Sequence, residues 1–193
     1  LSTLNIEISC DGAIALQAGL VADTLGFQTP NTRPRTLRAV AGLMKFGGAT
    51  SDIPRRVLSA RTYEASRLLG LALAAIESSE NGRLVWTKVT ERMANTAGVQ
   101  VDDVQGVPNA LQDILGAVII AVFYEINPDH TRVSLRSHGP RIDGVAAAFG
   151  GGGHALAAGA TLDHKIDEAA DQVLARLQDE VTAGGEVFDD GKL

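Results

Sequence analysis

Residues 117–137 read AVIIAVFYEINPDHTRVSLRS, and the first part of this stretch is the longest uninterrupted apolar run of the chain. Such a run predicts a strand over residues 117–126 that is buried within a sheet. The Asn-Pro-Asp sequence at 127–129 predicts a turn. Beyond it, apolar and polar residues alternate over residues 131–137. The alternation predicts a second strand with one buried face and one polar face.

The segments on either side of this stretch change between strand and helix patterns. Four of them stand out: strands at 84–89 and 157–162, a short helix from Ile142, and an amphipathic helix at 165–182. We expect Asp163 to cap the last helix, because a carboxylate at a helix start accepts free backbone N–H groups. Strands interleaved with helices predict an α/β fold, with a mixed sheet in a domain at residues 81–183.

The first part of the chain has helical periodicity instead. The predicted helices lie at residues 9–22, 35–45, 50–59 and 61–78. Ser9 is expected to cap the first of them. We therefore predict a helical region at residues 1–60, a long connecting helix at 61–80 and a tail at 184–193.

The charge of the chain argues against tight binding of long nucleic acids. Its 193 residues carry a net charge of −6, so no general attraction to a polyanion is expected. The basic residues are nevertheless concentrated at residues 33–67, with eight cations and two anions. Most cations of the chain are arginine, the better bidentate partner for phosphate.

The compartment is predicted from two further features of the sequence. The longest apolar run is far shorter than the roughly 20 residues of a membrane span, so no membrane association is expected. The single cysteine, Cys10, excludes an internal disulfide and fits a reducing compartment. We therefore expect a cytoplasmic protein.

A run of glycines is the strongest local signal for a binding site. Gly150, Gly151, Gly152 and Gly153 directly precede His154. Glycines occur where the backbone approaches a ligand or adopts a positive φ, so valine at the second or third glycine should block binding. Successive N–H groups of such a loop can hold an anion. A flexible linker is the alternative. The P-loop and the dinucleotide fingerprint are excluded, because the first needs a Lys-Ser or Lys-Thr pair and the second needs strand-loop-helix order.

Basic residues near the end of the alternating strand form a second candidate feature. Arg136 lies on its polar face and is followed by Ser137. Together with Arg132, His138 and Arg141 it predicts a positive patch in an otherwise acidic half. An arginine facing the glycine run would clamp phosphate, and an ordinary surface arginine is the alternative.

One carboxylate occupies an isolated position. Asp23 is the only acidic residue in residues 12–51 and lies where an apolar helix ends. A turn cap and a functional role are both open from the residues alone. The histidines at 130, 138 and 164 show no metal-ligand spacing.

Taken together, three motifs resemble the DHH phosphoesterase family. VSLRS at 133–137 and GGGGHALAAG at 150–159 resemble its C-terminal, DHH-associated domain, and AGLVADTLGF at 18–27 resembles its last metal-binding motif. The resemblance covers residues 9–182. It is closest to the bacterial branch that degrades very short oligoribonucleotides and dephosphorylates 3′-phosphoadenosine 5′-phosphate (pAp).

The resemblance implies roles for these residues. Residues 1–60 would be the end of the catalytic lobe, and the domain at 81–183 would bind substrate: short single-stranded oligoribonucleotides or nucleotides. Asp23 would be one ligand of a centre that holds two Mn²⁺ ions in the intact enzyme. Arg136, Ser137, the glycine run and His154 would hold phosphate and nucleotide, and the family allows a homodimer.

The family's Asp-x-Asp and Asp-His-His motifs do not occur in this sequence. We therefore expect a fragment without a complete catalytic set. A cyclic-dinucleotide phosphodiesterase fragment and a non-catalytic nucleic-acid-binding module are the alternatives. Those two motifs, upstream in the parent gene, would separate the last alternative from the enzymes.

Overall fold

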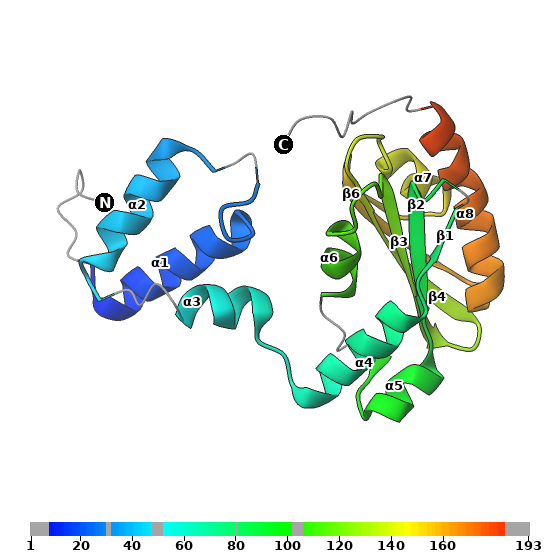
Figure 1. Cartoon of the computed structure of the whole chain (residues 1–193), viewed down its shortest axis with the longest axis horizontal. Helices are drawn as coiled ribbons and strands as arrows, with labels where there is room; N and C mark the ends of the chain where they lie inside the picture. The colour runs from blue at the N-terminus through cyan, green and yellow to red at the C-terminus, as the bar shows by residue number, and fades with distance from the viewer. Residues whose placement is uncertain (1–7, 30–31, 48–51, 80, 102–105, 184–193) are drawn as a thin grey trace. The chain divides into compact units, whose positions relative to one another are not determined.

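The computed structural model describes residues 8–29, 32–47, 52–79, 81–101 and 106–183. The chain divides into two compact units, Leu1–Arg61 and Thr62–Leu193 (Figure 1). The first unit is helical and the second holds the sheet, so the two candidate regions from the sequence, Asp23 and the glycine run, belong to different units.

The first unit contains α1 (Cys10–Asp23), α2 (Pro34–Met44), α3 (Asp52–Pro54) and a π-helical turn, η2 (Arg55–Ser59). The predicted cap of α1 is confirmed, because the Ser9 hydroxyl accepts a hydrogen bond from the Gly12 N–H. The last predicted helix of this unit forms only in part. Its end widens into the π turn, in which the Ala60 N–H donates to the carbonyl of Arg55, five residues back.

The second unit is built on a six-stranded sheet with the order β1-β2-β3-β4-β6-β5. Its strands are β1 (Glu77–Ser78), β2 (Leu84–Val89), β3 (Ile119–Asn127), β4 (His130–Ser137), β5 (Gly152–His154) and β6 (Ala157–Leu162). β2 and β3 are parallel and every other pair is antiparallel. The prediction of an α/β fold with a mixed sheet is confirmed.

Helices cover the sheet from both sides (Figure 1). α4 (Tyr63–Ala74), α5 (Glu91–Ala97) and α6 (Val107–Gln112) share one buried cluster with the even-numbered residues of β3. α7 (Asp143–Ala148) and α8 (Ile166–Ala183) share the other cluster with its odd-numbered residues. The apolar run is therefore buried on both faces, as predicted, and β3 is the centre of the core.

The predicted connecting helix at residues 61–80 is too long, because its last residues are not helical. The helix ends at Ala74, and Glu77–Ser78 pairs with β2 as an edge strand. The cause lies in the next turn, where the Ser79 hydroxyl donates to the Asn81 side-chain oxygen and accepts from the Leu84 N–H. These bonds fold the chain back onto β2, and sheet pairing replaces further helical turns.

Two more predictions need correction. Residues of the glycine run form the edge strand β5 rather than only a loop. Asp163 does not cap α8, which begins three residues later at Ile166; its carboxylate contacts His130 instead. α5 and α6 had not been predicted from the sequence.

None of the described helices combines the length and the apolar character needed to cross a bilayer.

Candidate functional site

The residues predicted for substrate binding meet on one face of the sheet. The register pairs Arg136 with Ala157, and Ala157 with His154. Directly opposite residues of antiparallel strands point to the same side of a sheet. Arg136 and His154 therefore lie in one row across β4, β6 and β5, with only a methyl group between them.

The next row along the strands is even smaller. Ser134 pairs with Gly159, and Gly159 pairs with Gly152. We call Ala157, Gly159 and Gly152 the small-residue floor. It lies on the α4–α6 side of the sheet, but no residue of β4, β5 or β6 belongs to the described buried cluster there. The floor is therefore a nearly flat surface on which a ligand could approach the backbone, with basic side chains at its edge.

The two basic groups of the first row differ in environment. Arg136 is half-buried, and its Nη1 donates to the Ser134 hydroxyl at 3.3 Å and to the Leu135 carbonyl at 2.9 Å. The guanidinium is thus folded back along β4 toward Ser134. His154 is exposed, and its ring has no hydrogen-bond or ion-pair partner among the described residues. The guanidinium is preset, and the imidazole is open to a ligand.

The predicted positive patch is smaller than the sequence suggested. Arg141 forms an ion pair with Asp143 at 2.6 Å. The His138 ring contacts the Gln112 carbonyl at 3.0 Å. Arg132 and Arg136 remain on the polar face of β4, as the alternation predicted.

Ser137 is not brought to this face. It pairs with Ile119, is 4% exposed and lies on the α7–α8 side of the sheet. Its hydroxyl accepts from the Gly139 N–H at 3.1 Å. Successive residues of a strand point to opposite faces of the sheet, so the sequence already indicated that Ser137 and Arg136 lie on different faces. Ser137 fixes the turn after β4.

The first two glycines of the run close α7. The Gly150 N–H donates to the Ala147 carbonyl and the Gly151 N–H to the Ala146 carbonyl, at 3.0 and 2.9 Å. Gly150 has a φ of +74°, which favours glycine. Because both N–H groups are used inside the protein, these two positions do not form the predicted anion-binding loop.

Close backbone packing explains the middle of the run. A Cβ on Gly151 would overlap the Gly159 carbonyl oxygen, and a Cβ on Gly153 would lie 2.5 Å from the Ala157 carbonyl oxygen. A Cβ on Gly152 would meet nothing within 4 Å. The run is therefore a tightly packed edge strand rather than a flexible linker, and Gly152 has open space in front of it.

A hollow of about 500 Å³ opens beside the floor. Its lining includes Tyr124, Arg132, Ser134, Gly151, Gly159 and Thr161. The Arg132 guanidinium carbon lies 4.7 Å from the centre of the Tyr124 ring, in a cation–π contact. We call this feature the Arg132 hollow. The contact between Arg132 and Tyr124 depends on the register of β3 and β4, so it was not predicted from the sequence.

Burial raises the pKa of Tyr124 to about 12, although the nearby Arg132 and Arg136 lower it in part. Between about pH 10 and 12 an unfolded tyrosine ionises while the folded one stays neutral. We therefore expect the free energy of unfolding to lose about 2–3 kcal/mol over this range, a loss that is absent below it. Denaturant unfolding from pH 9 to 12 should show a shallower decline for Tyr124→Phe. Equal slopes for both proteins would contradict this expectation.

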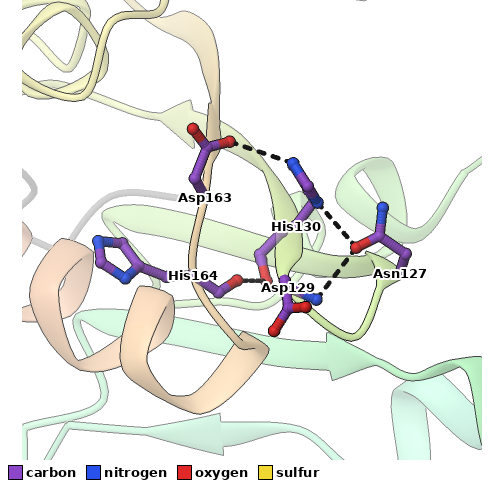
Figure 2. A network of polar contacts seen from close by, with 6 residues as sticks. Asn127, Asp129, His130, Asp163 and His164 are labelled. Atoms are coloured by element: carbon purple, nitrogen blue, oxygen red, sulfur yellow. Dashed lines mark hydrogen bonds and ion pairs between the residues drawn. The ribbon is translucent and has the colours of Figure 1, made fainter.

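A polar network fixes the strand ends beside the hollow (Figure 2). His130 contacts the Asn127 side-chain oxygen at 2.8 Å and Asp163 at 3.4 Å. The Thr131 hydroxyl donates to the His164 carbonyl at 2.9 Å. Two Asp-His sequences, at 129–130 and 163–164, thus lie next to each other, and their contacts tie the β3–β4 turn to the segment before α8.

Asp23, in the first unit, is the exposed last residue of α1. The Thr24 hydroxyl after it donates to the Leu20 carbonyl at 2.6 Å and accepts from the Phe27 N–H at 3.1 Å. Leu25 and Phe27 have positive φ, which is strained for residues with side chains. Such strain is concentrated at functional sites, and this strained turn directly follows Asp23.

The carboxylate of Asp23 is a suitable donor for a hard divalent ion such as Mn²⁺. Within the part of the chain that the structure describes, however, no three His, Cys, Asp or Glu side chains gather around a possible ion. The described residues therefore do not by themselves fit a two-metal centre. Further donors would have to join Asp23.

The fold and the open face define an α/β domain with a mixed sheet and a basic, small-residue surface. Residues 81–183 match the family model described as the DHHA1 domain. The chain belongs to the DHH phosphoesterase family through this domain, which confirms the resemblance of the sequence motifs.

Curated relatives place it near one branch. The chain is 31% identical over 187 residues to the bifunctional oligoribonuclease and PAP phosphatase NrnA of Thermus thermophilus, covering 96% of this chain and 56% of that protein. It is 30% identical over 175 residues to the protein of the same name from Bacillus subtilis, covering 89% and 53%. The chain spans about half the length of the curated relatives it matches.

A solved structure supports the fold. An exopolyphosphatase-related protein from Bacteroides fragilis superimposes with a TM-score of 0.81 at 24% identity, covering 91% of this chain and 53% of the other. At this identity the likeness establishes the fold, and the binding role of the open face must be argued from its own residues.

Proposed function

We propose that this chain is the substrate-binding portion of a manganese-dependent phosphoesterase that hydrolyses short oligoribonucleotides and pAp. The observation that carries the proposal is the row in which Arg136 and His154 flank Ala157. The activities named for the two NrnA relatives support the substrate class.

The row suits a terminal phosphate. The Arg136 guanidinium provides several N–H donors, and His154 adds one from the opposite edge of the floor. Charge-assisted hydrogen bonds of this kind are about twice as strong as neutral ones. In the next row, Gly159 and Gly152 offer no side chain that would exclude a sugar lying on the strands.

Asp23 is proposed as a ligand of the metal centre in the whole enzyme, where two Mn²⁺ ions would supply Lewis-acid chemistry. Among the described residues, no group of three or more His, Cys, Asp or Glu side chains completes that centre. This chain alone should therefore bind nucleotides without hydrolysing them.

We expect the 193-residue chain to release no mononucleotide from a 5′-phosphorylated tri-adenylate in excess Mn²⁺, while still binding it. Binding measured by calorimetry should weaken as salt rises, because phosphate contacts are screened. Mononucleotide release would be measured by chromatography, with Asp23→Ala as the matched variant.

Two results would contradict the assignment. Release by the chain that persists in Asp23→Ala would show that the activity does not use Asp23. Absence of any nucleotide binding would show that the open face is not a substrate site.

A further inference from the structure

The Arg132 hollow is a second preformed feature of the open face, separate from the row of Arg136 and His154. Its aromatic wall is part of the core, because Tyr124 is only 3% exposed and packs in the cluster with α4–α6. The ring holds the Arg132 guanidinium at 4.7 Å. A flat cation is therefore fixed in place at the side of an open cavity.

The strand that carries this arginine is also anchored. Thr131, the preceding residue, donates to the His164 carbonyl at 2.9 Å. One residue earlier, His130 is held between Asn127 and Asp163 (Figure 2). The start of β4 is thus tied on both sides, so a ligand in the hollow would meet a rigid wall.

The chemistry of the lining suits a planar heteroaromatic ring. Gly159 leaves the bottom of the hollow without a side chain, and the register places Ser134 and Thr161 on the same side of the sheet as Arg132. Hydroxyl groups can donate to or accept from ring nitrogens and exocyclic groups. Guanidinium planes are a common stacking surface for unpaired bases. The volume of about 500 Å³ is within the range of small-molecule sites.

The hollow also lies next to the row of Arg136 and His154, where we expect a phosphate to bind. Ser134 lines the hollow and at the same time accepts the hydrogen bond from Arg136. Arg132 and Ser134 are two residues apart on one strand, which is about 7 Å. A phosphate held by the Arg136 guanidinium would therefore lie at the mouth of the hollow, with its own nucleoside directed inside.

We propose that the Arg132 hollow is a nucleobase subsite, in which the base attached to the phosphate held by Arg136 stacks on the Arg132 guanidinium. This proposal rests on the proposed function. It adds that the face recognises a nucleotide by its base as well as by its phosphate.

The test compares adenosine 5′-monophosphate with ribose 5-phosphate, which lacks the base, by calorimetry on the full chain. Wild type should bind the nucleotide about tenfold more tightly, as expected for one stacked base. Arg132→Ala should reduce this ratio to near one while leaving the affinity for ribose 5-phosphate unchanged. Arg132→Lys should do the same, because lysine keeps the charge and loses the plane.

Arg176→Ala is the matched control, because it removes an exposed arginine from α8, outside the hollow. It should leave both affinities unchanged. Circular dichroism and unfolding midpoints would show that each variant is folded, and a misfolded Arg132→Ala would leave Arg132→Lys as the deciding variant.

The remaining outcomes overturn the proposal in distinguishable ways. Equal affinity of wild type for the two ligands would overturn the base subsite, but not the proposed binding of phosphate by Arg136 and His154. Loss of ribose 5-phosphate binding in Arg132→Ala, with recovery in Arg132→Lys, would make Arg132 a phosphate contact instead. Failure of wild type to bind either ligand would overturn the proposed function together with the subsite.

Discussion

Valine at Gly151 should destabilise the domain and abolish nucleotide binding, whereas valine at Gly152 should abolish binding in a stable domain. At Gly151 the new Cβ overlaps backbone atoms of β6, which cannot move aside as a side chain can. Overpacking costs about 1–3 kcal/mol, and we expect the upper end here. The sequence alone predicted the same effect at both positions.

The Gly152 variant separates binding from folding. A Cβ at this position meets nothing within 4 Å, and the register directs it onto the small-residue floor beside Gly159. Valine also fits an edge strand, because β-branched residues favour extended backbone. Its two methyl groups would occupy the surface on which we expect the nucleotide to lie.

Unfolding midpoints and calorimetry with adenosine 5′-monophosphate would measure both effects. Gly152→Ala is the matched control and should retain part of the affinity, because it adds a single methyl group. Unchanged affinity in Gly152→Val would show that the nucleotide does not lie on the small-residue floor. A stable, binding-competent Gly151→Val protein would contradict the close packing of Gly151 on β6.

Alanine at Arg136 or at His154 should weaken nucleotide binding without unfolding the domain. A hydrogen bond to a charged group contributes about 1.5–3 kcal/mol, so we expect about a tenfold to a hundredfold loss of affinity. Neither side chain belongs to the buried clusters, and alanine at Arg136 would remove its hydrogen bonds to Ser134 and Leu135, which lie on the same strand.

Titration of each variant with a 5′-phosphorylated oligoribonucleotide would test this expectation. Arg141→Ala is the control, since Arg141 is an equally basic neighbour already paired with Asp143. Wild-type affinity in both Arg136→Ala and His154→Ala would rule out a phosphate contact at these two residues. A loss in only one of them would restrict the contact to one edge of the floor.

Long and strongly patterned elements could be predicted from the sequence. The apolar run and the alternation after it identify β3 and β4, because burial on two faces and on one face produce different patterns. α5 and α6 were missed because they have seven and six residues, too few for helical periodicity to be recognised.

The candidate site was predictable only residue by residue. Arg136 and His154 were identified by their motifs, but their shared row depends on the pairing of β4, β6 and β5, which no local pattern contains. β5 itself was hidden because glycine is depleted in strands. The same dependence on register explains why the contact of Arg132 with Tyr124 was not foreseen.

The position of β5 at the edge of the sheet affects the thermodynamics of binding. The strand has three exposed residues and pairs only with β6, so among the described strands it belongs to those that open locally at low free-energy cost. A ligand that contacts both Arg136 and His154 would join this edge to β4. Part of the binding free energy would then order the edge strand, and the measured affinity would be linked to its local unfolding equilibrium.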